Sequence, residues 1–138
     1  MPVKAFLDTN VLIYAVTDDD PRSAQAEKLL ASGGVLSVQV LNEFVSVVRR
    51  KILMSWTDVT KALDAFRILC PSPLPITMET HETALRIAAK HRYNIYDALV
   101  IAAALEAGCA TLYSEDLDDG QTIDGQLTIR NPFAKSSG

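Results

Sequence analysis

Four acidic side chains stand where carboxylates could gather around a divalent cation: Asp8, Glu43, Asp97 and Asp116. Carboxylates a few ångströms apart repel one another, and a hard divalent cation relieves that repulsion while preferring oxygen ligands. Mg²⁺ held by one or two carboxylates keeps open coordination positions, which let it activate water and stabilise the leaving oxygen of a phosphodiester. The residue types therefore indicate metal-assisted hydrolysis, provided that the fold brings the four acids together.

Two of these acids come directly after predicted strands. The apolar run at residues 3–7 ends at Asp8, and a second run at residues 109–113 is followed closely by Asp116. Short apolar strands that alternate with helices are typical of a parallel sheet, and the ligands of such sheets bind beyond the carboxyl ends of the strands. We therefore expect Asp8 and Asp116 to project from the same edge.

Each acid also has a simpler explanation. Asp97 lies in the first turn of a helix that is apolar nearly all round, where it could complement the helix dipole, although a carboxylate is seldom buried without a partner. Glu43 shares a helical face with other polar residues, which a solvated face would explain; no Lys or Arg follows four positions later to pair with it. Asp8 and Asp116 could each cap a following helix.

Apolar runs alternate with amphipathic stretches along the whole chain. Extended segments are expected at residues 3–7, 35–37, 74–78, 109–113 and 127–130. Helices are expected at residues 11–16, 22–32, 38–51, 56–70, 80–92 and 95–107, with Thr57 and Asn94 as N-caps of the fourth and the last. This order predicts a three-layer α/β/α sandwich with a short-stranded, mainly parallel sheet. We expect one domain over residues 1–133 and a disordered tail over residues 134–138.

The composition narrows the possible functions. Of 138 residues, 13 are Lys or Arg and 17 are Asp or Glu, which gives a net charge of −4. This mild acidity argues against broad electrostatic adhesion to nucleic acid. Without the four candidate acids the positive and negative charges balance, so a local basic rim can still guide a polyanion.

Other features predict a cytoplasmic protein without a cysteine- or histidine-based site. Cys70 and Cys109 have neither metal-site spacing nor the density of a disulfide scaffold, so reduced, semi-buried thiols are expected. His81 and His91 lie ten positions apart in one predicted helix, which does not make a zinc site, and both are expected at the surface. No apolar run approaches the ~20 residues of a membrane span, and the chain opens directly into a predicted core strand, so we expect no signal peptide.

Four segments, taken together, resemble the motifs of PIN-domain nucleases. They are Leu-Asp-Thr-Asn-Val-Leu-Ile at 7–13, Leu-Asn-Glu-Phe at 41–44, Tyr-Asp-Ala-Leu-Val-Ile-Ala-Ala-Ala at 96–104, and Leu-Tyr-Ser-Glu-Asp-Leu at 112–117. Asn-Pro-Phe at 131–133 resembles a common ending of the family. The resemblance implies a sheet flanked by helices and a Mg²⁺- or Mn²⁺-dependent endoribonuclease. Small members of this family are mostly VapC-type toxins, commonly homodimers that a cognate antitoxin inhibits by placing its tail in the acidic groove.

The resemblance also implies a role for each matching position. The metal-binding and catalytic acids are Asp8, Glu43, Asp97 and Asp116. Asn10 and Ser114 match polar positions that support the acids through hydrogen bonds. Asp118 lies where some members carry a further acid, but we expect it to be a solvated loop acid. Water activated by the metal would attack the phosphorus directly, so no protein nucleophile is required.

The expected substrate is single-stranded RNA, because a groove site reaches exposed phosphates most easily. Basic residues near predicted helix ends could form a rim that guides the RNA backbone, although solvated helix ends that complement the dipole are the simpler explanation. They are Arg49, Arg50, Lys51, Arg86, Lys90 and Arg92.

Two alternative functions remain open. A phosphatase of the haloacid dehalogenase type also begins with a strand and a nucleophilic Asp, but its second Asp is here Asn10, which cannot act as a general acid. The chain could instead be a non-catalytic module whose acidic groove binds a basic partner. An acid-stable phosphoaspartate at Asp8 would favour the first alternative, and tight peptide binding without RNA cleavage would favour the second.

Overall fold

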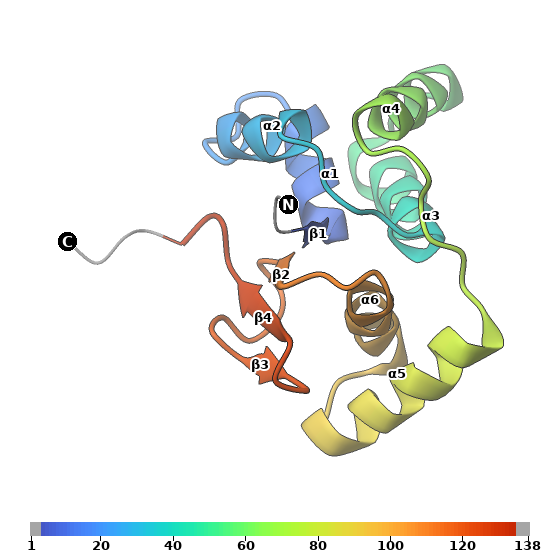
Figure 1. The fold of residues 1–138 in the computed structure, drawn as a ribbon. Coiled ribbons are helices and arrows are strands. Elements are labelled where there is room, and N and C mark those ends of the chain that lie inside the picture. Colours follow the sequence, from blue (N-terminus) through green and yellow to red (C-terminus); the bar gives the residue numbers. More distant parts are fainter. Residues whose placement is uncertain (1–3, 135–138) are drawn as a thin grey trace.

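The sheet is short-stranded and mainly parallel in the computed structural model, which describes residues 4–134 (Figure 1). In spatial order the strands are β1 (Ala5–Leu7), β2 (Thr111–Tyr113), β4 (Leu127–Arg130) and β3 (Thr122–Ile123). β1 pairs with β2 and β2 with β4 in parallel, with Phe6, Leu112 and Ile129 in register, whereas β3 pairs antiparallel with β4. β1 and β2 therefore end side by side at one edge of the sheet.

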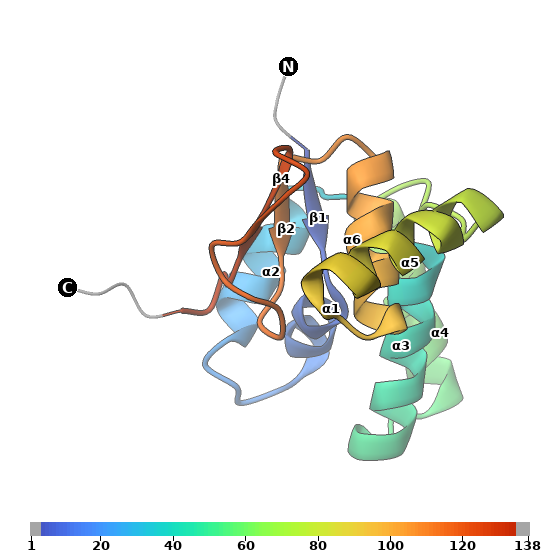
Figure 2. The ribbon, with the colours of Figure 1, turned by 90° about the horizontal axis from the view of Figure 1, so that it is seen from below.

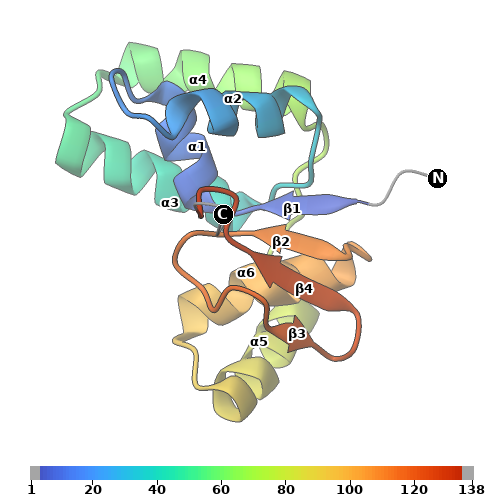
Figure 3. The ribbon, with the colours of Figure 1, turned by 90° about the vertical axis from the view of Figure 1, so that its left-hand side faces the viewer.

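Six α-helices and one π-helical turn connect the strands within residues 4–134. They are α1 (Thr9–Val16), α2 (Ser23–Ala31), α3 (Val38–Val47), the π-helix η1 (Val48–Ile52), α4 (Trp56–Leu69), α5 (Met78–His91) and α6 (Ile95–Glu106). α6, with α5 beside it, lies against one face of the sheet, and α1 to α4 lie together on the side of β1 (Figure 3). Helices therefore flank the sheet on two sides, and the predicted α/β/α sandwich is confirmed. None of these described helices is long and apolar enough to cross a membrane.

Two details of the sheet differ from expectation. The segment 35–37 is not a strand, because it forms only isolated bridges from its two ends to Phe6 and Leu74. The sequence does not reveal β3, since a two-residue strand is too short to carry an alternating pattern. The predicted start of the first strand at Val3 and the predicted tail beyond Ala134 lie outside the described residues.

Side-chain caps mark the helix starts, and those of α4 and α5 differ from expectation. Ser55, not Thr57, caps α4, and Thr77 caps α5 ahead of its predicted start. The Asn94 cap of α6 is confirmed. The helix predicted over residues 38–51 divides into α3 and η1, because the hydrogen bonding widens to a π-helix in its last turn.

The cysteines and one histidine belong to packed regions. Cys70 and Cys109 are free and fully buried, deeper than the semi-buried thiols expected. His81 is exposed as expected. His91 is partly buried, and its Nδ1 lies 3.0 Å from Gln121 Nε2, so its predicted surface position is wrong. The sequence hides this because the contact joins the end of α5 to a distant loop.

An aromatic pair fixes α3 to the core. Phe44 is fully buried, and its ring meets that of Phe66 on α4 edge-on, with centroids 5.0 Å apart. Such a pair adds to the apolar burial that each ring already contributes. Because Glu43 immediately precedes Phe44, this packing also sets where the Glu43 carboxylate can reach.

Removal of the Phe44 ring should unfold the protein readily. We expect Phe44→Ala to lower the free energy of unfolding by about 3–5 kcal/mol, because it removes buried apolar surface and leaves a cavity against Phe66. Urea denaturation followed by circular dichroism measures the change. The control Ile68→Ala, at a residue 79% exposed on α4, should change it by less than about 0.5 kcal/mol. Equal effects of the two substitutions would contradict the assignment of Phe44 to the core.

Candidate active site

Asp8 is buried where β1 passes into α1. Its Oδ1 accepts a hydrogen bond from the Thr9 amide at 2.7 Å, and its Oδ2 accepts one from the Ser114 hydroxyl at 2.7 Å. The first bond is that of an N-cap, and the second comes from the end of the neighbouring strand β2. One carboxylate thus caps a helix and joins two strand ends, with only 6% of the residue exposed.

Asn10 and Ser114 hold Asp116 close to this point. Asn10 Nδ2 donates to Asp116 Oδ2 at 3.3 Å, and Ser114 Oγ accepts from the Asp116 amide at 3.2 Å. Asn10 Oδ1 also accepts from the Glu115 amide at 3.3 Å. Residues 115–117 form bends and no helix, so the capping alternative for Asp116 is wrong.

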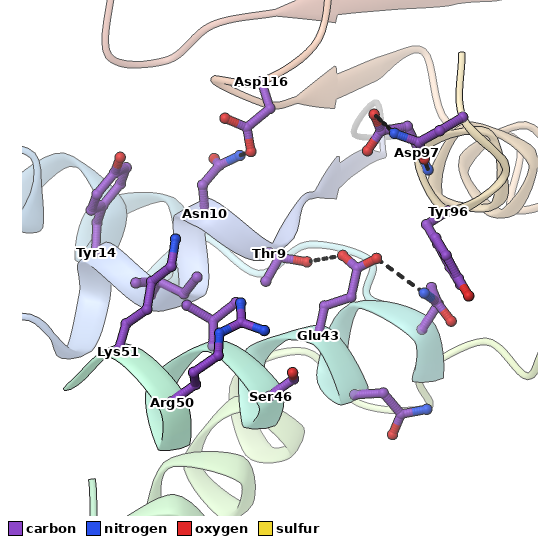
Figure 4. A pocket seen from close by; sticks show the side chains of 15 residues that line it. Thr9, Asn10, Tyr14, Glu43, Ser46, Arg50, Lys51, Tyr96, Asp97 and Asp116 are labelled. Carbon is purple, nitrogen blue, oxygen red and sulfur yellow. Dashed lines mark hydrogen bonds between the residues drawn. The ribbon is translucent and has the colours of Figure 1, made fainter. Parts of the chain in front are cut away.

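Glu43 reaches the same region from α3. Its Oε2 accepts from the Thr9 hydroxyl at 2.8 Å and its Oε1 from Gln39 Nε2 at 3.0 Å (Figure 4). Because Thr9 directly follows Asp8, this hydrogen bond ties the Glu43 carboxylate to the residue next to Asp8. Glu43 is half-buried and bonded, so a freely solvated face does not describe it. The sequence analysis does not single out Thr9, although its place directly after Asp8 is a usable signal.

Asp97 lies in the first turn of α6, at the end of the molecule where β1 and β2 also end (Figure 2). Its Oδ2 accepts from Asn94 Nδ2 at 3.0 Å, and its amide donates to Asn94 Oδ1 at 2.9 Å. The residue therefore completes the helix start, while its half-buried carboxylate also lines a pocket. Burial, followed by the charges of Glu43 and Asp116, raises the pKa of Asp97.

The side chains of Glu43, Asp97 and Asp116 line one pocket of about 780 Å³ (Figure 4). Asp8 comes directly before two of its lining residues, Thr9 and Asn10, in the chain. Burial raises the pKa of Asp8 to about 6, and the charges of Glu43 and Asp116 add to this effect against the hydrogen bonds that Asp8 accepts. Carboxylates from separate elements therefore repel one another across the pocket.

The donor set fits a hard divalent cation. All four candidate ligands offer carboxylate oxygens, and a cation would reverse the two raised pKa values. Within residues 4–134, however, no three acidic, histidine or cysteine side chains lie close enough to hold one ion together. The carboxylates therefore line a shared space but do not by themselves complete the coordination shell of an ion. Mg²⁺ is commonly bound in such spaces, by one or two carboxylates with water and substrate phosphate completing its shell.

Glu115 is bound by the first helix and the turn that follows it. It accepts hydrogen bonds from the Tyr14 hydroxyl at 2.9 Å and from Arg22 Nη1 at 3.0 Å. Arg22 also pairs with Asp20 at 2.8 Å and lies 3.8 Å from the centre of the Tyr14 ring. Glu115 therefore orders the loop before Asp116 without adding unpaired charge. These partners are 93 and 101 positions from Glu115 in the chain, and the sequence carries no signal for them.

The predicted basic rim divides into two groups. Arg50 and Lys51 line the same pocket as the carboxylates. The remaining basic candidates lie outside its lining: Arg49, Arg86, Lys90 and Arg92.

Asp118 also lies outside the lining of the pocket. It is exposed and accepts a hydrogen bond from the Tyr93 hydroxyl at 3.2 Å.

Comparison with known proteins identifies the fold. The PIN-domain family model matches residues 5–121. Among solved structures, VapC20 of Mycobacterium tuberculosis, a toxin that cleaves the sarcin–ricin loop, is 24% identical with a TM-score of 0.66, over 83% of this chain and 92% of that one. A toxin–antitoxin complex from Klebsiella pneumoniae is 16% identical with a TM-score of 0.70, over 94% and 98%. VapBC2 of Rickettsia felis, bound to promoter DNA, is 18% identical with a TM-score of 0.66, over 92% and 98%. No curated protein matches the sequence.

The raised pKa of Asp8 predicts how stability depends on pH in metal-free protein. Between its ordinary value of 3.8 and about 6, the folded chain holds a proton on Asp8 that the unfolded chain has released. The stability from protonated Asp8 is therefore complete below about pH 4 and is lost as the pH rises through about 6. Across that range in EDTA, the free energy of unfolding should fall by roughly 2–3 kcal/mol more for the wild type than for Asp8→Asn.

Urea denaturation at a series of pH values measures this difference. Asp64→Asn, which removes an exposed carboxylate on α4, should keep the pH dependence of the wild type. If the curves for wild type and Asp8→Asn run parallel, the Asp8 carboxyl titrates normally and does not experience the repulsion inferred here.

Proposed function

This chain belongs to the PIN-domain family, and we propose that it is a divalent-metal-dependent endoribonuclease that acts as the toxin of a toxin–antitoxin pair. The main support is the pocket lined by Glu43, Asp97 and Asp116, with buried Asp8 adjoining it. These acids come from four separate elements, and the pKa values of Asp8 and Asp97 respond to the charges of the other two.

In the proposed mechanism, one or two of Asp8, Asp97 and Asp116 would bind the cation directly, and the remaining acids, with Glu43, would hold it through water. When bound, Mg²⁺ or Mn²⁺ lowers the pKa of a coordinated water and offsets the negative charge of the scissile phosphate. The chain's own residues orient the carboxylates. The Ser114 hydroxyl and the backbone amide after Asp8 fix both oxygens of Asp8, which leaves the carboxylate in one rotamer.

Three further side chains orient the other acids. Thr9 and Gln39 occupy both oxygens of Glu43 with donated hydrogen bonds, and Asn10 does the same for one oxygen of Asp116. Hydrogen bonds of this kind typically change metal affinity or activity by about 10–100-fold. No side chain needs to act as a nucleophile, since water attacks the phosphorus directly.

The proposed partners follow from the similar structures. The Klebsiella structure is a toxin–antitoxin complex, and the Rickettsia structure is VapBC2 on promoter DNA; from these we propose a cognate antitoxin that covers the acidic pocket. We further propose that the chain forms a homodimer and acts in the cytoplasm, where RNA and antitoxin are both available. The geometry gives no support to a haloacid dehalogenase-type phosphatase, because Asn10 is occupied by Glu115 and Asp116.

RNA cleavage tests the proposed activity. With Mg²⁺ or Mn²⁺ the purified protein should cut a pool of single-stranded RNA, and EDTA should stop it. Asp116→Asn should lower the rate by more than about a hundredfold, because an exposed ligand is lost without disturbing the core. Asp64→Asn, the same chemical change outside the pocket, should cleave like the wild type. Cleavage that survives EDTA or Asp116→Asn would refute the metal mechanism, and tight binding of a basic peptide without cleavage would indicate the binding module.

Metal binding should also be visible without RNA. Mn²⁺ at one hundred times its dissociation constant should stabilise the wild type by about 2.7 kcal/mol, measured as a rise in melting temperature. Asp97→Asn should melt at or above the wild type in EDTA, because it relieves repulsion from Glu43 and Asp116, and should gain less from Mn²⁺. A wild-type melt unchanged by millimolar Mn²⁺ would contradict the metal site. A metal-free Asp97→Asn that melts well below the wild type would instead assign Asp97 a structural role at the start of α6.

A further inference from the structure

The pocket carries opposite charges at different points along one helical face. Glu43, Val47 and Arg50 follow one another at spacings of four and three, so they lie on the same side of α3 and η1, and all three line the pocket together with Lys51. In Figure 4, Arg50 and Lys51 lie on one side of Glu43 and Tyr96 lies on the other. The carboxylate of Glu43 therefore lies between two cationic side chains and the aromatic ring of Tyr96.

The two cations of the pocket are uncommitted among the described residues. The ion pairs within residues 4–134 involve Arg22 and Arg86, and neither Arg50 nor Lys51 takes part in one. The adjacent Arg49 differs, because it donates to a backbone carbonyl at 2.7 Å and stacks on a tryptophan ring. Two exposed cations beside a carboxylate cluster suit a ligand that brings more than one negative charge.

The two tyrosines of the pocket differ in what their rings can accept. One face of the Tyr14 ring is covered by Arg22 at 3.8 Å, and Phe133 meets the ring edge-on with centroids 5.1 Å apart. Tyr96, in the first turn of α6 beside Asp97, is 61% exposed. An exposed aromatic ring at the wall of a polar pocket is a platform on which an unpaired base can stack.

From these observations we propose that the pocket binds single-stranded RNA through two subsites beside the cleavage point. Arg50 and Lys51 hold a phosphate next to the scissile one, and Tyr96 stacks on an unpaired base on the opposite side. This inference rests on the proposed ribonuclease function and adds to it the residues that hold the RNA on either side of the scissile phosphate. Base-paired RNA would present phosphates to the cations but no free base to Tyr96.

Salt-dependent binding tests the phosphate subsite. All proteins carry Asp116→Asn so that the RNA stays intact in Mg²⁺, and fluorescence anisotropy follows an unstructured, labelled single-stranded RNA between about 50 and 200 mM salt. Each phosphate that is no longer neutralised should flatten the plot of log affinity against log salt by roughly 0.7, so Arg50→Gln with Lys51→Gln, which frees one phosphate, should flatten it by roughly 0.7. The control Lys61→Gln removes an exposed cation on α4, outside the pocket, and should leave the slope unchanged.

Substitution of Tyr96 tests the base subsite in the same assay. Tyr96→Ala should weaken single-stranded binding by about fivefold or more with the slope unchanged, whereas Tyr96→Phe keeps the ring and should bind normally. A duplex of the same sequence should bind equally to wild type and Tyr96→Ala. Because all these side chains are exposed, circular dichroism should show intact folds.

Three results would overturn the subsites: no measurable RNA binding, a double variant with the slope of Lys61→Gln, or a Tyr96→Ala protein that binds like wild type. An intact wild-type enzyme that never cuts RNA, or an Asp116→Asn protein that does, would instead refute the proposed ribonuclease function. The slopes and the cleavage rates are separate measurements, so the two failures can be distinguished.

Discussion

The burial of the Asp8 carboxylate at the end of β1 is the constraint around which the site is arranged. A charged oxygen with so little access to water must accept hydrogen bonds, and the nearest donors are the first amide of α1 and the hydroxyl at the end of β2. Those two bonds fix how the first helix leaves the sheet and how the β2 loop begins. Each further acid then approaches a carboxylate that is already immobile.

The surrounding contacts show how the fold tolerates so much negative charge in one place. Thr9, Asn10 and Ser114 are neutral donors, and each binds a carboxylate without cancelling its charge. The only acid of the loop that meets a cation directly is Glu115, through Arg22. The fold thus pairs with a cation the acid that positions the loop, whereas the pocket acids form no ion pair within residues 4–134, as the proposed metal binding requires.

The elements with strong local signals could be predicted from the sequence. The apolar run before Asp8, the Asn94 cap and the parallel arrangement follow from short-range patterns, and they place three acids near one edge. The bond between Thr9 and Glu43 and the contacts of Glu115 could not be predicted, since they depend on how separate helices pack. The sequence therefore located the candidate acids and, through the family resemblance, the donors Asn10 and Ser114, but not Thr9 and Gln39, which orient Glu43.

The narrow outer strand of the sheet has a consequence for behaviour at high concentration. β3 is only two residues long and occupies the edge beyond β4, where an ordinary strand would expose a row of unpaired amides and carbonyls. So short an edge gives another chain little to pair with, which discourages strand-to-strand aggregation. At this edge, the sheet therefore offers a second molecule too little free backbone to extend it by another strand.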